Sequence, residues 1–155
     1  GWVIGSGATS RSALVAFLDL GVTHVVIQSR SEPRSETMEL ARQLGLTVTT
    51  RTYDRGWPDL AGVDVAMSTA PAYAELPPPP SVSTGVAGDT LAMDVVYQPR
   101  AAAWGNQMST AGAGVIDGSA MLLHQAVEQV RLMTGLEPPV EAMRTALHEA
   151  LKAGE

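Results

Sequence analysis

The stretch Trp2-Val3-Ile4-Gly5-Ser6-Gly7-Ala8-Thr9-Ser10-Arg11 decides the fold of this chain. It predicts a short buried strand, a glycine turn and, directly after the turn, an amphipathic helix. That order builds a phosphate cradle, because the first backbone N–H groups of such a helix have no partner and point at an anion. Gly5 is expected to allow the tight turn, and Gly7, which lacks a Cβ atom, lets a pyrophosphate approach the backbone. The predicted pyrophosphate contacts are Gly5, Ser6, Gly7, Ala8 and Thr9.

The end of the second predicted strand indicates which dinucleotide fits the cradle. This strand covers about 24–28 and lies roughly twenty residues after the glycine turn, where a dinucleotide fold reads the adenosine ribose. A site for NAD usually ends this strand with Asp or Glu. Here the strand ends Ser29-Arg30-Ser31-Glu32-Pro33-Arg34, so Arg30 and Arg34 can flank a 2′-phosphate with their forked N–H donors. The sequence therefore predicts NADP as the cofactor.

The other polar residues of this tip fit the same interpretation. The hydroxyls of Ser29 and Ser31 add neutral hydrogen-bond donors, and Glu32 is expected to point into solvent. The alternative is that both arginines are ordinary surface residues at a helix start. Arginine is unfavourable in the first turn of a helix, where the dipole is positive, so we prefer the phosphate interpretation.

Composition narrows the class of protein. The chain has 155 residues, enough for one domain with a core, and no cysteine, which excludes disulfides and thiolate metal sites. The net charge of -6 without a basic run argues against nucleic-acid binding. No signal peptide or membrane-spanning stretch is apparent, so we expect a cytoplasmic protein. The first strand begins within two residues of the start, which suggests a piece of a longer protein.

Strands alternating with helices predict an α/β fold with a doubly wound parallel sheet, Rossmann-like, of strand order 3-2-1-4-5-6. The further predicted strands are 46–50, 63–67, 91–95 and 114–116, and the predicted helices are 8–20, 33–44, 118–133 and 139–152. Residues 51–62 are expected to form a loop with one helical turn near 58–60, and the four prolines at 77–80 to form a rigid exposed loop. We divide the chain into a nucleotide-binding part, 1–117, and two C-terminal helices, 118–155, which pack on the sheet and toward an absent domain.

Four motifs in order resemble the C-terminal, NADP-binding half of shikimate dehydrogenase, over nearly the whole chain. The glycine loop with a following Ser and Arg is similar to 5–11, and the family's second-strand tip, Asn-Arg-Thr with a further Arg, is similar to 29–34. The family's Asp-x-x-Tyr-x-Pro is present as Asp94-Val95-Val96-Tyr97-Gln98-Pro99. Its Gly-x-x-Met-Leu-x-x-Gln-Ala is similar to Gly118-Ser119-Ala120-Met121-Leu122-Leu123-His124-Gln125-Ala126.

The resemblance implies further roles. Val95, Gly118 and Met121 would border the nicotinamide, while Tyr97 and Gln125 would reach toward the carboxylate and hydroxyls of a shikimate-like substrate. The residue-based alternatives are a strand-end aromatic for Tyr97, a backbone-capping amide for Gln125 and a core side chain for Met121.

The chain departs from the family pattern at three places. Ala8 stands where the loop usually has a third glycine. Met67-Ser68-Thr69 stands where the family commonly has Asn-x-Thr, so Thr69 alone is retained as a cofactor contact. The threonine that often follows the tyrosine motif is replaced within Arg100-Ala101-Ala102-Ala103. These departures leave the cofactor assignment in place and bear on the identity of the substrate.

The implied reaction is reversible hydride transfer between NADPH and 3-dehydroshikimate, in aromatic amino acid biosynthesis. The family's catalytic Lys and Asp lie in an N-terminal substrate domain that this chain lacks. Its one lysine, Lys152, is far in sequence from every motif, and neither a Ser/His/Asp triad nor a metal-ligand cluster is apparent. We therefore expect no catalytic residue and no metal in this chain.

Two other functions remain open at this point. One is a related two-domain enzyme, such as a quinate dehydrogenase, which Arg30 disfavours if it prefers NAD, or a methylenetetrahydrofolate dehydrogenase, which Tyr97 and Gln125 disfavour. The other is a non-catalytic module that senses a dinucleotide, which the fold alone does not exclude.

Overall fold

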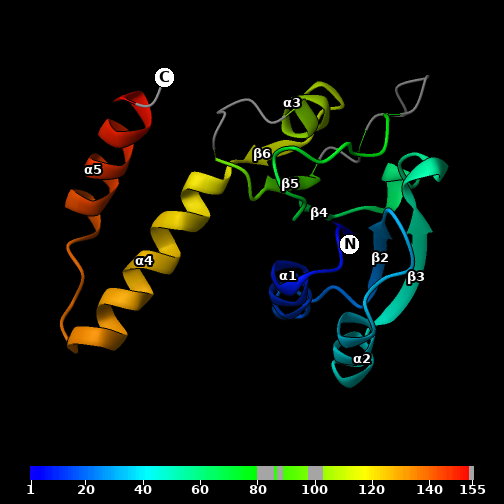
Figure 1. Cartoon of the computed structure of the whole chain (residues 1–155), viewed down its shortest axis with the longest axis horizontal. Helices are drawn as coiled ribbons and strands as arrows, with labels where there is room; N and C mark the ends of the chain where they lie inside the picture. The colour runs from blue at the N-terminus through cyan, green and yellow to red at the C-terminus, as the bar shows by residue number, and fades with distance from the viewer. Residues whose placement is uncertain (80–85, 87–88, 98–102, 154–155) are drawn as a thin grey trace.

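Six parallel strands form one sheet in the order β3-β2-β1-β4-β5-β6 (Figure 1). The computed structural model describes residues 1–79, 86, 89–97 and 103–153. The strands are β1 (Trp2–Ile4), β2 (His24–Ser29), β3 (Thr47–Thr52), β4 (Val65–Ser68), β5 (Leu91–Asp94) and β6 (Gly114–Ile116). The α-helices are α1 (Ala8–Asp19), α2 (Ser35–Gln43), α3 (Ala103–Thr110), α4 (Gly118–Thr134) and α5 (Val140–Ala153). Two 3-10 helices, η1 (Tyr53–Arg55) and η2 (Leu60–Gly62), lie between β3 and β4.

The predicted strand order is confirmed, and its reversal between β1 and β4 places the glycine turn at the switch point of the sheet. Successive side chains of a strand point to opposite faces, so β1 contributes to two cores. Val3 packs with Leu14 and Phe17 of α1 on one face. Trp2 and Ile4 face the other side, where the sheet is lined by a separate apolar cluster.

Three tryptophans organise the second cluster. The ring of Trp2, which is fully buried, lies 5.5 Å from that of Trp57 and 5.7 Å from that of Trp104, centroid to centroid. Both pairs are tilted or edge-on, an arrangement that aromatic rings favour. Trp104 comes from α3, so this helix covers the sheet face opposite to α1.

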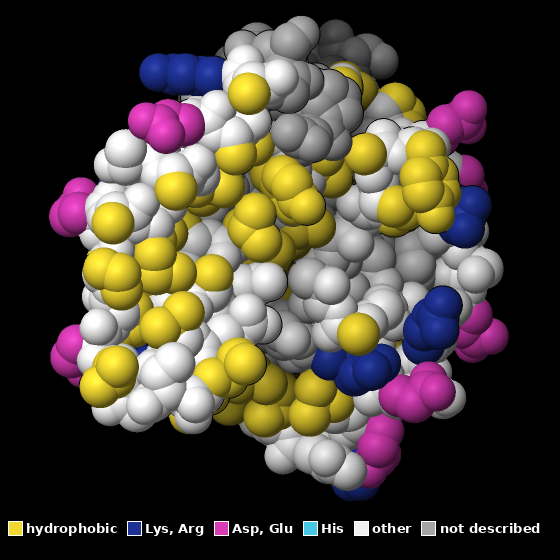
Figure 2. Space-filling model, turned by 60° about the vertical axis from the view of Figure 1, so that its left-hand side comes forward, with side chains coloured by type: hydrophobic (Ala, Val, Ile, Leu, Met, Phe, Trp, Pro, Cys, Tyr) yellow, Lys and Arg dark blue, Asp and Glu magenta, His cyan; other side chains and the backbone are white. Residues whose placement is uncertain are grey.

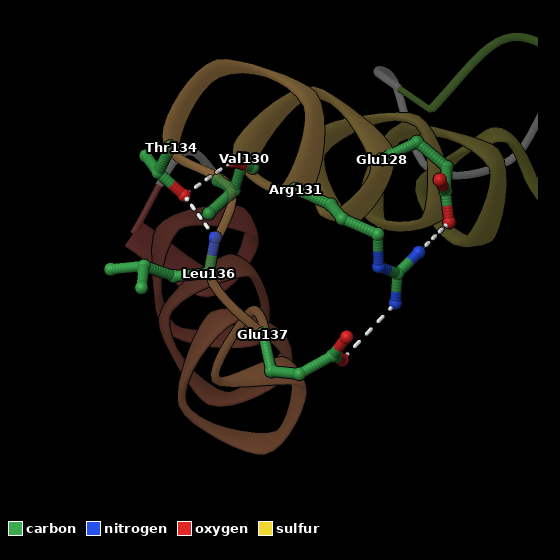
Figure 3. Close-up of polar contacts among 6 residues, drawn as sticks. All are labelled: Glu128, Val130, Arg131, Thr134, Leu136 and Glu137. Atoms are coloured by element: carbon green, nitrogen blue, oxygen red, sulfur yellow. Dashed lines mark hydrogen bonds and ion pairs between the residues drawn. The ribbon is translucent and has the colours of Figure 1, made fainter.

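Helices α4 and α5 pack on one another to one side of the sheet (Figure 1). Near the end of α4, the Arg131 guanidinium contacts the Glu128 carboxylate of the same helix and lies 3.4 Å from that of Glu137, in the segment that joins α4 to α5 (Figure 3). The Thr134 hydroxyl donates to the carbonyl of Val130 at 2.7 Å and accepts from the Leu136 N–H at 3.1 Å. These bonds fix how the chain reverses.

Large apolar side chains remain exposed near this turn. Leu132, Met133 and Leu136 are all more than two-thirds exposed. Figure 2, in which this side of the molecule comes forward, shows hydrophobic side chains spread over much of that face. Within the described ranges, every helix is too short or too polar to cross a bilayer.

Three predicted boundaries were wrong by two residues each. Helix α2 begins at Ser35 and not at Pro33, because Arg34 keeps an extended backbone and is the N-cap. Strand β3 continues to Thr52, since it pairs with β2 along the whole of that strand. Strand β4 begins at Val65 because η2 and the bond from the Val63 N–H to the Leu60 carbonyl use the preceding residues.

Two predictions failed more substantially. Helix α3 lies in a region where no helix was predicted. The four prolines were predicted to be exposed, yet Pro77 is buried and its carbonyl accepts a hydrogen bond of 2.9 Å from the indole N–H of Trp57. Pro78 and Pro79 are exposed as expected. Pro80 and the motif residues Gln98, Pro99 and 100–102 lie outside the described residues.

Candidate functional site

The glycine turn after β1 is held in place by its neighbours on both sides. The Gly5 N–H donates to the carbonyl of Gln28 in β2 at 2.7 Å, and the φ angle of Gly5 is +110°. On the β4 side, both the N–H and the hydroxyl of Thr69 donate to the carbonyl of Ile4, at 2.9 and 2.8 Å. The turn therefore lies between the ends of β2 and β4, with little freedom to move.

Two further hydroxyls fix the start of α1. The hydroxyl oxygen of Ser10 accepts from the Gly7 N–H at 3.1 Å and lies 2.7 Å from that of Thr69. Because the Thr69 proton goes to the Ile4 carbonyl, the Ser10 proton must go to Thr69. The N–H groups of Ala8 and the next residue have no carbonyl upstream in the helix, so they remain to bind an anion.

A third hydroxyl reaches the turn from α2. Thr37 is fully buried, and its hydroxyl donates to the carbonyl of Ser6 at 2.8 Å. This bond orients the peptide between the two glycines of the loop. The roles of Ser10 and Thr37 were not predicted from the sequence, since hydroxyl residues are common in helices and the hydrogen-bond partners of these two lie on other elements.

A cleft of about 630 Å³ collects most of the predicted cofactor contacts. Its predicted lining residues are Gly5, Ser6, Gly7, Ser29, Arg30, Ser31, Arg34 and Thr69. The residues that sequence analysis did not assign to it include Tyr53, Tyr73 and Glu75. Ala8 and Thr9 are exposed in the first turn of α1 and are not among its lining residues.

The tip of β2 presents arginine to this cleft. The buried Ser29 hydroxyl donates to the carbonyl of Ser31 at 2.6 Å, so Ser29 shapes the tip and its proton is already used. Arg30 and Arg34 are exposed, and within the described residues neither forms an ion pair. Glu32 is exposed, as predicted, although it also borders the cleft.

The remaining predicted contacts gather at a second place, where β5 meets α4. The Gly118 N–H donates to the carbonyl of Val96 at 3.4 Å, and the Gly118 Cα lies directly against the Val95 peptide. Met121 is half-buried one turn further along α4, and Gln125 follows on the same face at i+4 spacing and is exposed. Tyr97 is 40% exposed. The structure thus brings Val95 and Gly118 together and leaves the two predicted substrate residues open to solvent.

Asp94, the last residue of β5, holds the backbone at this second place. Asp94 and Ser68 are register partners on β5 and β4, and the Asp94 carboxylate accepts from the Val96 N–H at 3.1 Å. Asp94 is only 3% exposed, and burial raises the pKa of its carboxyl, although the bond from the Val96 N–H and the neighbouring Ser68 hydroxyl both lower it. The carboxyl therefore fixes the turn after β5, whose Val96 carbonyl accepts from the first residue of α4.

This raised pKa makes stability depend on pH. A carboxyl whose pKa is higher in the folded than in the unfolded chain favours folding at acid pH, and this stability is lost as pH rises through the folded pKa. Asp94→Asn keeps the acceptor for Val96 but does not ionise. We expect its unfolding free energy to increase relative to that of the native chain as the pH rises from about 3 to about 7. Parallel pH profiles in urea unfolding would contradict this assignment.

Among the residues described, no three His, Asp or Glu side chains are grouped so that they could hold a metal ion.

A family model described as "Shikimate 5'-dehydrogenase C-terminal domain" matches residues 118–148. The shikimate dehydrogenase (NADP(+)) of Archaeoglobus fulgidus is 33% identical over 161 residues, which cover 97% of this chain and 56% of that protein. The chain therefore spans about half the length of the curated relatives it matches.

Solved structures of shikimate dehydrogenases are also similar to this chain. The crystal structure of Mycobacterium tuberculosis shikimate dehydrogenase superposes with a TM-score of 0.72 at 31% identity, covering 96% of this chain and 55% of that one. A shikimate dehydrogenase in complex with NADP+ superposes with a TM-score of 0.72 at 25% identity, covering 97% and 54%.

Proposed function

We propose that this chain, which is similar to shikimate dehydrogenases over nearly its whole length, is the C-terminal, NADP-binding part of an NADP-dependent shikimate dehydrogenase. The complete protein would catalyse reversible hydride transfer between NADPH and 3-dehydroshikimate. The observation that carries the proposal is the cleft that joins the glycine turn to Arg30 and Arg34, with no carboxylate at the end of β2.

The residues present fit this cofactor. A Cβ atom on Gly7 would meet no atom within 4 Å, so the space above the turn is open to a pyrophosphate. The amides of Ala8 and Thr9 would bind that pyrophosphate at the N-terminus of α1. At the far end of the cleft, the guanidinium groups of Arg30 and Arg34 would hold the 2′-phosphate. Their positive charge is not neutralised by an ion pair among the described residues.

The second place at β5 and α4 would border the reactive end of the cofactor, which supplies the hydride when bound. Val95 and Gly118 would position the nicotinamide with Met121, while Tyr97 and Gln125 would face the substrate. We infer that these two side chains are exposed here because they serve a cleft that a second domain completes. Residues 118–155 would contribute to that contact, and the catalytic acid–base groups would come from the second domain.

Replacing Arg30 tests the cofactor assignment. Arg30→Ala should weaken NADP binding by several-fold to a hundredfold, the scale of a lost hydrogen bond to a charged group. NAD lacks the 2′-phosphate, so its affinity should barely change. Titration of the native and variant chains with both cofactors, followed by tryptophan fluorescence or calorimetry, measures the two affinities. The exposed Arg42, which is paired with Glu39 on α2, gives the control Arg42→Ala, which should alter neither. An equal loss for both cofactors would refute the 2′-phosphate site.

A further inference from the structure

Tyr53 lies in the cofactor cleft, although the glycine turn and the tip of β2 do not include it. It is the first residue of η1, directly after β3, and it lines the same cleft as Arg30 and Ser31. Its ring is half-buried and packs against the apolar cluster that contains Trp2 and Trp57. The Tyr53 side chain thus packs against the core and also borders the cleft.

The loop that carries Tyr53 is held by a buried hydrogen-bond network. The Gln28 side chain, fully buried in β2, donates to the carbonyl of Thr52 at 3.0 Å and to that of Gly56 at 2.7 Å. Its own oxygen accepts from the indole N–H of Trp2 at 3.0 Å. The two carbonyls flank η1, so one amide fixes the backbone before and after the tyrosine.

An arginine holds the same loop from the other side. The Nε of Arg51 donates to the carbonyl of Gly56 at 2.9 Å, and its Nη2 donates to that of Trp57 at 3.1 Å. A side chain mounted on a loop with this many bonds loses little conformational entropy when it binds a ligand. Tyr53 is therefore a preorganised group.

The electrostatics of Tyr53 and Arg30 favour the binding of an anion. Tyr53 and Arg30 line the same cleft, and the guanidinium lowers the pKa of the phenol, while burial raises that pKa by more. The phenol consequently keeps its proton and acts as a donor at neutral pH. A neutral O–H beside a guanidinium adds a hydrogen bond to a shared anion without adding charge.

We propose that the hydroxyl of Tyr53 is a second donor, with Arg30, to the 2′-phosphate of NADP, and so a residue that selects NADP over NAD. This inference rests on the proposed function, because it needs the adenosine end of the cofactor in this cleft. A 2′-phosphate carries three acceptor oxygens, which is enough for both arginines and the phenol. NAD offers only a 2′-hydroxyl at that position.

The test is Tyr53→Phe, which removes one oxygen and keeps the ring in the core. We expect NADP to bind about tenfold more weakly, the scale of one hydrogen bond to a charged group, and NAD to bind as before. Arg42→Ala is the control, because Arg42 is exposed on α2, is paired with Glu39 and does not line the cleft. That control should change neither affinity. Thermal unfolding without cofactor checks that both variants fold like the native chain.

The double variant Arg30→Ala with Tyr53→Phe adds a second measurement. If both groups bind one phosphate, the losses should be non-additive, since residues that share a partner couple. Unchanged NADP affinity in Tyr53→Phe, or an equal loss of NAD, would overturn the inference. If Arg30→Ala still weakens NADP selectively in that case, the proposed function stands and only the tyrosine assignment fails.

Discussion

Replacing Gly5 by alanine is expected to lower the free energy of unfolding by about 3 kcal/mol and to abolish measurable NADP binding. Two independent costs add. The φ angle of +110° is one that L-residues rarely adopt, and a Cβ atom there would lie 2.4 Å from the Thr69 hydroxyl oxygen. That hydroxyl cannot move freely, because it is bonded to both Ser10 and the Ile4 carbonyl. Urea unfolding gives the stability, and titration with NADP gives the binding.

Gly7→Ala is the matched control for this prediction. Gly7 has an ordinary φ angle of −87° and open space around its Cβ direction. We expect a loss of stability of about 1 kcal/mol, since alanine is a poorer N-cap than glycine by about this amount. NADP binding should still weaken, because the new methyl group occupies the space assigned to the pyrophosphate. A Gly5→Ala chain as stable as the native one would show that the turn is not constrained as described.

Replacing Gly118 by alanine is the second change with a large expected effect. A Cβ atom there would lie 2.2 Å from the carbonyl oxygen of Val95 and 2.5 Å from its carbon. Both are backbone atoms, so either the end of β5 or the start of α4 must shift. We expect a loss of about 3 kcal/mol in unfolding free energy, the scale of strong overpacking. Hydrogen exchange should also accelerate in the first turn of α4.

Gly105→Ala provides the contrast. Gly105 is a buried glycine within α3, and a Cβ atom there would make an ordinary contact of 3.6 Å with Val115. Alanine favours a helix over glycine by up to about 1 kcal/mol, so this variant should be as stable as the native chain or slightly more stable. If Gly118→Ala behaved like Gly105→Ala, the close packing of α4 on β5 would be refuted.

The strand order could be predicted because each parallel strand carries a local signal. Apolar or β-branched runs separated by helical patterns specify a doubly wound sheet, and the glycine turn identifies the first strand. Helix α3 could not be predicted in this way. Its segment contains Gly105 and several polar residues, and only Trp104 and Met108, four residues apart, mark its buried face. Burial against the sheet, and not intrinsic propensity, stabilises that helix.

The candidate site likewise has one part that local sequence patterns predict and another part that they do not. The backbone cradle and Arg30 follow from local patterns, and the cleft contains both. Tyr53 and Thr37 come from elements that reach the turn only after the sheet has formed, so no spacing along the chain relates them to it. The buried amide of Gln28 was a usable signal, since a polar residue that ends a buried strand must find partners nearby.

The hydroxyl chain from Gly7 through Ser10 and Thr69 to the Ile4 carbonyl runs in one direction only. Each hydroxyl has a single proton, and each proton is already committed inside the protein, so neither side chain has one left for a bound phosphate. An anion in this turn meets main-chain N–H groups, which do not titrate. Any pH dependence of the pyrophosphate affinity must then come from the ligand or from distant charged groups. Substitution of Ser10 or Thr69 would change the shape of the turn and leave its charge as it is.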